Sequence, residues 1–306
     1  MTGNTLGIID LGTNTALLII GQINSFGEIT ILTDQYAMVR LGNGVDSTRR
    51  INSQAMDRAC EQLKTYAKTA ELFGVTNLTA WGTSAVRDAI NKEELIKQVY
   101  STSRINLRVL EALDEAKFTY FGATYGLKLP NRLVVIDIGG GSTEIACGTK
   151  REIIHKQSIN IGALRLSEQY KFNDLTDDSQ VKEIRSKILR LMNNINPPQK
   201  NDSLIAVSGT ALTIAALATG CRHIFDPILH GRYIKASFVK HCFEKYSHMT
   251  PEQLSNIPAI GPDRSHIIVA GIFILDTFLT HNAFDGFIAS MGGVRYGLLE
   301  DLIHSA

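Results

Sequence analysis

Two short turns, each rich in glycine and hydroxyl side chains, carry the residues best suited to chemistry in this chain. The first turn is residues 10–15 (Asp-Leu-Gly-Thr-Asn-Thr), and the second is residues 137–144 (Asp-Ile-Gly-Gly-Gly-Ser-Thr-Glu). An apolar run precedes the aspartate of each turn, and another apolar run follows the turn. Asp137 follows Asp10 by 127 residues, a spacing far longer than that of solenoid repeats. The repeat predicts two similar domains, each of which presents one turn.

Turns of this composition are suited to bind phosphate. Glycine lets the backbone approach an anion closely, and successive backbone N–H groups then form a concave anion site. An aspartate at a strand end can hold Mg²⁺, which prefers a few carboxylates together with phosphate oxygens. One such turn alone is equally compatible with an ordinary hairpin, but two matched turns favour phosphate binding. We expect the two turns to face each other and hold one phosphate chain between the domains. Neither turn has the spacing of a Walker loop or of a dinucleotide-binding fingerprint.

The pattern of apolar residues predicts an α/β chain around these turns. Apolar runs at 6–9 and 16–20, separated by the first turn, predict a hairpin. Further strands are expected at 28–32, 77–81, 133–136, 145–147, 203–207 and 287–291. Helical spacing is found at 53–73, 93–101, 114–125, 177–195, 211–218 and from 294 to the end, and residues 250–252 have the pattern of a helix start.

Composition excludes several classes of protein. The 306 residues carry 31 basic and 30 acidic side chains, and this balance argues against a nucleic-acid partner. The most apolar stretch, residues 267–279, is too short to span a bilayer and contains an aspartate, so we expect a buried helix and no membrane partner. The N-terminus does not read as a signal peptide, and the four cysteines form no CxxC pair. Reduced thiols of a cytoplasmic protein explain them.

Ten motifs occur in an order that resembles one known family. They are residues 10–15, 40–42, 83–89, 114–116, 137–144, 162–166, 208–211, 230–231, 264–268 and 295–299. Together they resemble the exopolyphosphatase/guanosine pentaphosphatase family (Ppx/GppA phosphatases), in its short two-domain form. The resemblance implies two actin-like (ribonuclease H-like) domains flanking a central cleft. Residues 1–124 would form the first, with the helix 294–306 packing back on it, and residues 125–293 the second.

The resemblance also implies an activity and its residues. The activity is Mg²⁺-dependent hydrolysis of the terminal phosphate of polyphosphate or of pppGpp, with Mn²⁺ as an alternative metal. Glu115 would activate the attacking water, and Asp10, Asp137 and Glu144 would organise the metal. The phosphate site would be made by Gly12, Thr13, Asn14, Thr15, Arg87, Gly139, Gly140, Gly141, Ser142, Thr143 and Gly209.

Two departures from the family pattern bear on substrate and rate. Leu17 stands where the first turn often has a basic residue, and residues 111–112 (Glu-Ala) replace a small Ser-Gly pair before Glu115. A (p)ppGpp- or polyphosphate-binding sensor with little catalysis is therefore an alternative function.

Several individual assignments also have alternatives. Arg87 either faces the phosphates or pairs with a carboxylate such as Asp88. Arg165, Arg264 and Arg295 either line the cleft or form surface salt bridges, and Ser208 and Thr210 either bind phosphate or cap a helix. The sequence leaves open whether the protein forms a homodimer.

Overall fold

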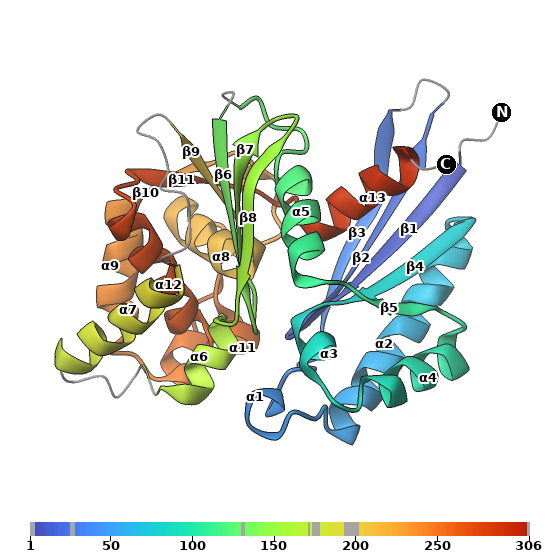
Figure 1. Ribbon diagram of the computed structural model, residues 1–306, viewed down its shortest axis with the longest axis horizontal. Helices are drawn as coiled ribbons and strands as arrows, with labels where there is room; N and C mark the ends of the chain where they lie inside the picture. Colours follow the sequence, from blue (N-terminus) through green and yellow to red (C-terminus); the bar gives the residue numbers. More distant parts are fainter. Residues whose placement is uncertain are drawn as a thin grey trace. The chain divides into compact units, whose positions relative to one another are not determined.

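The chain divides into two compact units. Unit 1 is Met1–Phe118 with Val294–Ala306, and unit 2 is Thr119–Gly293. A computed structural model describes residues 4–24, 28–129, 132–170, 172, 178–192 and 202–304 (Figure 1). The sequence placed the division after residue 124, whereas the structure places it inside helix α5 (Ala112–Ala123).

Unit 1 is built on a five-stranded mixed sheet with the order β3-β2-β1-β4-β5. Strands β1, β2 and β3 are antiparallel neighbours, whereas β4 and β5 run parallel to β1. The strands are β1 Asn4–Leu11, β2 Thr15–Ile23, β3 Ile29–Met38, β4 Asn77–Gly82 and β5 Leu107–Val109. The helices are α1 Val45–Thr48, α2 Ser53–Leu72, α3 Ser84–Asp88, α4 Lys92–Ser103, the first part of α5, and α13 Val294–His304. Parallel strands require crossovers, which α2 and the pair α3 and α4 supply.

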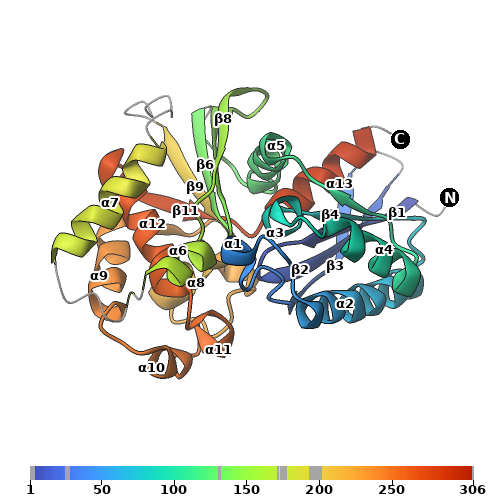
Figure 2. The same cartoon turned by 60° about the horizontal axis from the view of Figure 1, so that its bottom comes forward.

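Each face of this sheet is buried under helices from a different part of the chain. Successive β1 residues point to opposite faces, so Ile9 and Leu11 pack with α2 and α4, whereas Leu6 and Ile8 pack with α13. Figure 2 shows α2 and α4 on one side of the strands and α13 on the other. The last helix of the chain therefore lies beside its first strand.

Unit 2 is built on a six-stranded sheet with the order β10-β11-β9-β6-β7-β8. Strands β6, β7 and β8 are antiparallel neighbours, and β9 runs parallel to β6. The strands are β6 Arg132–Ile138, β7 Thr143–Thr149, β8 Ile153–Ile159, β9 Ser203–Val207, β10 Tyr233–Lys235 and β11 Gly286–Ala289. The helices are α6 Ala163–Gln169, α7 Asp178–Met192, α8 Ser208–Thr219, the 3₁₀ helix η2 Pro227–Leu229, α9 Ala236–Tyr246, α10 Pro251–Ser255, α11 Gly261–Arg264 and α12 Ile268–His281.

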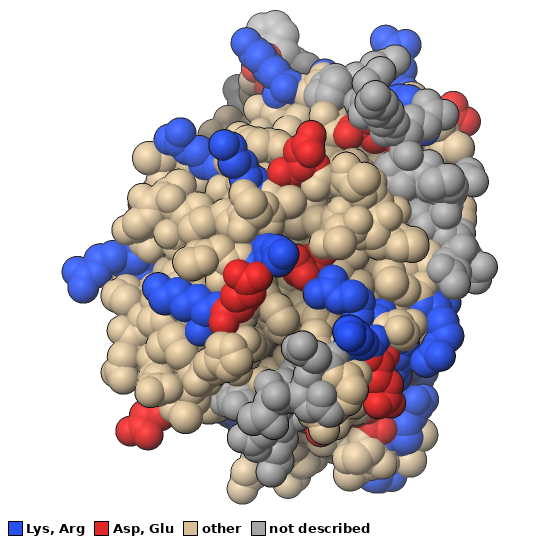
Figure 3. Space-filling model, turned by 90° about the vertical axis from the view of Figure 1, so that its left-hand side faces the viewer, with Lys and Arg blue, Asp and Glu red and all other residues tan. Residues whose placement is uncertain are grey.

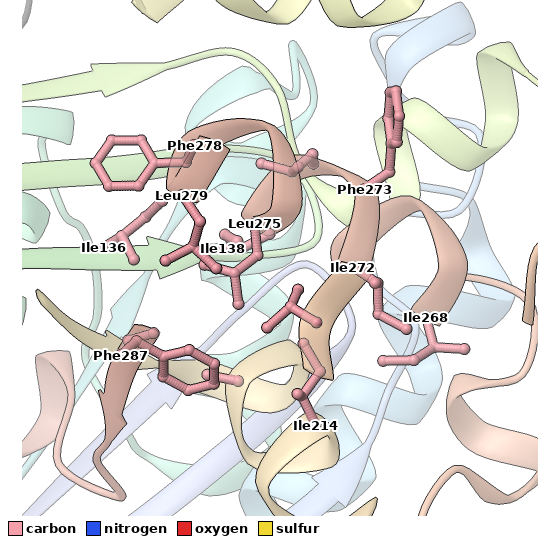
Figure 4. Packing of buried hydrophobic residues seen from close by; sticks show 14 of the residues in the cluster. Ile136, Ile138, Ile214, Ile268, Ile272, Phe273, Leu275, Phe278, Leu279 and Phe287 are labelled. Carbon is pink, nitrogen blue, oxygen red and sulfur yellow. The ribbon is translucent and has the colours of Figure 1, made fainter. Parts of the chain in front are cut away.

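Helix α12 is the centre of the core of unit 2. Its residues 268–279 are all buried, which confirms the buried helix predicted from the apolar stretch. Ile272, Leu275 and Phe278 pack among Ile136 of β6 and Phe287 of β11 (Figure 4). Each such side chain contributes roughly 1.5–3 kcal/mol when fully buried. Within the described residues, no helix is long and apolar enough to cross a membrane.

The two sheets share one topology. In each, three consecutive antiparallel strands are followed by a strand that runs parallel to the first: β1-β2-β3 with β4, and β6-β7-β8 with β9. The α/β fold class predicted from the sequence is confirmed, as two mixed sheets with duplicated topology. Predicted helix 177–195 corresponds to α7, but its expected end lies outside the described residues.

The charged residues of unit 2 are mixed in sign on its outer helical side. Figure 3 shows Lys and Arg side chains next to Asp and Glu side chains there, and no large patch of one sign. This mixture agrees with the chain's formal net charge of +1.

Candidate active site

The first turn joins β1 to β2 in unit 1. Asp10 lies next to the end of β1 and directly opposite Leu17 of β2, and it is 8% exposed. The backbone N–H of Gly12 donates to the carbonyl oxygen of Thr15 at 2.8 Å, which closes the hairpin. Thr13 and Asn14, at the tip, are also buried.

The second turn joins β6 to β7 in unit 2 and has the same geometry. Gly139 N–H donates to Ser142 O at 3.0 Å, in the place of the Gly12 bond in unit 1. Asp137 stands opposite Glu144, just as Asp10 stands opposite Leu17. The position that holds a carboxylate in unit 2 therefore holds an apolar side chain in unit 1.

A row of three polar side chains crosses the sheet of unit 2. Asp137, Glu144 and Ser158 are direct cross-strand partners on β6, β7 and β8, so they share one face. The Ser158 hydroxyl donates to Glu144 Oε1 at 2.6 Å. Sequence reasoning missed Ser158, because the strand that carries it was not predicted.

Ser208 fixes the other carboxylate of this row. Its hydroxyl donates to Asp137 Oδ1. Ser208 adopts a left-handed backbone conformation, with a φ of 70°, at the junction of β9 and α8. Residues other than glycine rarely adopt this conformation, and such strain concentrates at functional sites. The sequence offered phosphate binding or helix capping for Ser208, and the structure shows a bond to a site carboxylate.

The residues of unit 2 fit a divalent cation that also binds phosphate oxygens. Asp137 and Glu144 are 8% and 2% exposed, and two carboxylates on one buried face repel each other unless a cation or protons neutralise them. Mg²⁺ typically takes one or two protein carboxylates and completes its shell with phosphate and water. The described residues contain no group of three or more His, Cys, Asp or Glu side chains arranged to hold a metal. Asp10 belongs to unit 1, so unit 2 by itself supplies two carboxylates.

Glu115 lies in the first turn of α5 and is held by Arg87. Arg87 Nη1 donates to Glu115 Oε2 at 2.8 Å and to the carbonyl oxygen of Leu110, also at 2.8 Å. The two side chains are only 15% and 10% exposed, so water screens this ion pair weakly. From the sequence, Arg87 was expected to face phosphates or to pair with a carboxylate such as Asp88. The structure shows it on the candidate catalytic base.

Two further predicted site residues, Thr143 and Gly209, contact other residues of unit 2. The Thr143 hydroxyl is fully buried and donates to Ile161 O at 2.6 Å, so its hydrogen is already used inside unit 2. Gly209 lies against the guanidinium of Arg264, since a Cβ at Gly209 would be 3.0 Å from Arg264 Nε.

Arg264 and Arg295 are both buried, so neither side chain lies on the surface. Arg264 is 9% exposed. Arg295 is 5% exposed and binds both carboxylate oxygens of Asp34, at 2.9 and 2.7 Å. Burial lowers the pKa of Arg295, but the Asp34 carboxylate outweighs that effect and leaves the pKa raised, so the guanidinium stays charged.

Several known proteins with similar sequences are named as phosphatases. A 27% identical match over 95% of the chain is the bifunctional 3-dehydroquinate synthase/phosphatase of Fusobacterium nucleatum, of which the chain spans 46%. Exopolyphosphatase 1 of Mycobacterium bovis is 26% identical over 96% of the chain and 87% of its own length. The putative exopolyphosphatase of Haemophilus influenzae is 24% identical over 97% of the chain and 91% of its own length.

Solved structures of similar proteins share the whole fold. An exopolyphosphatase from Cytophaga hutchinsonii superposes with a TM-score of 0.90 at 25% identity, covering 99% of both chains. The Ppx/GppA family member of Aquifex aeolicus gives a TM-score of 0.84 at 27% identity, over 99% of this chain and 98% of that one. The model of the Ppx/GppA phosphatase family matches residues 19–306. The sequence motifs, the duplicated fold and this match agree, and the chain belongs to the Ppx/GppA phosphatase family.

Proposed function

We propose that this chain hydrolyses the terminal phosphoric anhydride bond of inorganic polyphosphate, of pppGpp, or of both. The observation that carries the proposal is the Arg87–Glu115 pair, a nearly buried carboxylate held in a fixed position by a guanidinium. Family membership and the exopolyphosphatase relatives support the reaction class. Fold alone would not separate this activity from others.

The proposed reaction transfers the terminal phosphoryl group to water. The water oxygen bonds to the terminal phosphorus, the bridging P–O bond breaks, and Glu115 accepts a proton from the water. Backbone N–H groups of the glycine turns stabilise the charge on the phosphoryl oxygens.

The acidic residues of the turns have a separate task. Asp137 and Glu144, with Asp10 as a further candidate, would hold Mg²⁺ or Mn²⁺. The metal would neutralise the phosphate chain and polarise the leaving group. Ser158 and Ser208 keep the two carboxylates of unit 2 in orientation.

A catalytically weak sensor of polyphosphate or (p)ppGpp is the second candidate, because of Leu17. This apolar residue stands opposite Asp10, at a position that often carries a cation in the family. Without that cation, the first turn attracts a long, highly charged polyphosphate less strongly. Release of phosphate from none of the substrates tested, with binding retained, would favour the sensor.

The test is a phosphate-release panel over short polyphosphate, long polyphosphate, pppGpp and ATP, with and without Mg²⁺. We expect Glu115→Gln to lose at least about 100-fold in turnover, the typical contribution of a general base, while its circular dichroism stays unchanged. Asp114→Asn is the matched control, because Asp114 precedes Glu115 on the same helix but is exposed. Normal hydrolysis by Glu115→Gln would refute the proposed mechanism.

A further inference from the structure

Backbone N–H groups of the loop that follows β3 donate hydrogen bonds to carbonyl oxygens of the first turn. This loop, residues 39–42, contains the family motif Arg-Leu-Gly, to which the reaction above assigns no role. Gly42 N–H donates to Thr13 O at 2.8 Å. Val39 and Arg40 N–H both donate to Asn14 O, at 3.0 and 2.9 Å.

The second turn is held in a similar way by the segment that follows β8, but the carbonyls that accept from its amides lie one position earlier in the turn than in unit 1. This segment, residues 162–165, consists of Gly162, the N-cap of helix α6, and the first three residues of that helix. Ala163 N–H donates to Gly139 O at 2.8 Å, and Leu164 and Arg165 N–H both donate to Gly140 O, at 2.9 and 3.0 Å. The Arg165 side chain adds a bond from Nε to Gly141 O at 2.8 Å. In both units, two successive amides therefore converge on one carbonyl oxygen, and a third amide binds the carbonyl before it.

Binding a carbonyl oxygen also orients the next amide. The peptide unit is planar and trans, so its N–H points in the direction opposite to its C=O. With the carbonyls of Gly139, Gly140 and Gly141 held by the loop, the N–H groups of Gly140, Gly141 and Ser142 point to the other side of the turn. Within the described part of the chain, these three amides donate to no protein acceptor. Successive backbone N–H groups that point to one side of a turn are the donors from which an anion site is built.

The same geometry applies in unit 1. The carbonyls of Thr13 and Asn14 are bound by the loop, which directs the N–H groups of Asn14 and Thr15 away from it. The backbone N–H of Asn14 has no protein acceptor among the described residues.

At one glycine of each segment, an added Cβ would lie very close to an atom of the turn. A Cβ on Gly162 would lie 2.5 Å from Gly140 O, and a Cβ on Gly42 would lie 2.2 Å from the methyl carbon of Thr13. Real Cβ atoms do not approach backbone atoms to 2.5 Å, so a larger residue at position 162 must displace the turn.

The backbone conformation of Arg40 is a second observation that supports this arrangement. Its φ of 48° lies in the left-handed region. Arg49 and Arg104 also have left-handed backbones, but both are exposed helix C-caps, where this conformation is common. Arg40 caps no helix, and its conformation brings the N–H groups of residues 39 and 40 together on Asn14 O.

We propose that segments 39–42 and 162–165 position the two phosphate-binding turns. They bind the outward carbonyls, so that the inward N–H groups are aligned for a terminal phosphate before it arrives. Gly162 and the Arg165 side chain do this for the second turn. The identity of the anion rests on the proposed function, whereas the alignment of the amides does not.

The test measures anion binding directly, with inorganic phosphate as the probe. Amide chemical shifts of Gly140, Gly141 and Ser142 are followed by NMR during a phosphate titration of the full chain. We expect these shifts to saturate in the wild type. Arg165→Met and Gly162→Ala should weaken phosphate binding and raise KM by about tenfold, the loss associated with one hydrogen bond to a charged group. The turnover number should change less than KM, because Glu115 is untouched.

Two control variants separate positioning from charge and from folding. Arg222→Met removes an exposed arginine of the same unit. Gly148→Ala introduces an even closer contact, 2.1 Å from Glu152 O, in the β7–β8 hairpin instead of the turn. Both should bind phosphate as the wild type does, even though Gly148→Ala lowers the temperature of unfolding.

The outcomes separate this proposal from the proposed activity. Wild-type phosphate affinity in both Arg165→Met and Gly162→Ala would overturn it, as would turn amides in the wild type that do not respond to phosphate. If the wild type hydrolyses none of the substrates but its turn amides bind phosphate in an Arg165-dependent way, the positioning role stands and the activity falls.

Discussion

At the scale of single residues, serine hydroxyl groups donate hydrogen bonds to the two buried carboxylates of unit 2. Ser158 and Ser208 each donate one hydrogen bond to the acidic side chain beside them. Removing the partner of a buried, charged group costs more than removing an exposed hydrogen bond, because the group is left without solvation. Residues that orient metal ligands commonly change metal affinity by about 10–100-fold when they are replaced.

Ser158→Ala should therefore raise the Mg²⁺ concentration needed for half-maximal activity by about tenfold or more. Ser158→Thr keeps the hydroxyl and should retain most of the affinity. The measurement is Mg²⁺ activation of phosphate release, together with Mn²⁺ binding to the free protein by electron paramagnetic resonance. Ser186→Ala, at an exposed serine of α7, is the control. Unchanged metal affinity in Ser158→Ala would show that Glu144 needs no hydroxyl partner.

The residues of the turns could be predicted from the sequence, but their partners could not. The acidic, glycine-rich runs around Asp10 and Asp137 are local patterns that identify the turns. The partner of Glu115 is Arg87, 28 positions earlier in the chain, and their contact depends on how α3 and α5 pack. Ser158 and Arg165 likewise reach the second turn only through the pairing of β8 and the start of α6.

At the scale of elements, His230 fastens the segment after α5 to the end of β11 within unit 2. Its Nδ1 accepts from Met291 N–H at 3.2 Å, so its Nε2 carries the hydrogen and donates to Tyr125 O at 3.0 Å. Burial lowers the pKa of His230, and the Tyr125 carbonyl offsets only part of that effect. A protonated ring has no acceptor left for Met291.

This geometry predicts a specific loss of stability in acid. The folded pKa lies below the ordinary value of about 6.5, so the unfolded chain takes up the proton first. Stability from neutral His230 is thus complete above about pH 6.5 and falls as the pH drops towards the folded pKa. Unfolding temperatures of the wild type and His230→Gln should differ most at pH 7.5 and converge towards pH 5. Curves that stay parallel would contradict this, and His223→Gln, at an exposed histidine, should follow the wild type.

Most elements were predicted from the sequence, and those that were missed share a physical cause. The hairpins around the turns were found because their strands are continuously apolar and buried on both faces. Strand β8 was missed because polar residues occupy most of it, and its burial comes from its neighbour β7. Strand β10 has three residues, too few to show a period. Helix α5 runs without a break through the boundary between the two units, so no local pattern marks that boundary in the sequence.

At the scale of the whole molecule, each unit has its own buried clusters, and one cluster of unit 1 is completed by helix α13. Val294, Leu298 and Leu299 of α13 pack on Leu6, Ile8 and Ile19. The approach is close, because a Cβ on Gly21 would lie 2.8 Å from Leu299 Cδ2. The stability of unit 1 therefore depends on residues nearly 300 positions from its first strand.

Leu299→Ala should destabilise unit 1 by about 2–5 kcal/mol, the usual cost of a buried leucine-to-alanine change. The single tryptophan, Trp81, lies on β4 and reports on unit 1 alone. Urea unfolding followed by Trp81 fluorescence should shift to lower urea in Leu299→Ala. Leu72→Ala, at a side chain 88% exposed, should leave the transition in place. An unshifted transition in Leu299→Ala would mean that α13 contributes little to unit 1.

The late position of α13 has a consequence for biosynthesis. A ribosome adds residues from the N-terminus, and domains usually fold in the order in which they emerge. Unit 1 cannot be completed before unit 2 is synthesised, because every strand of unit 2 precedes Leu298 and Leu299 in the chain. The nascent N-terminal sheet must therefore wait with one apolar face uncovered while the second unit is translated. That face is a natural target for a chaperone, and pausing translation shortly before residue 294 would prolong its exposure.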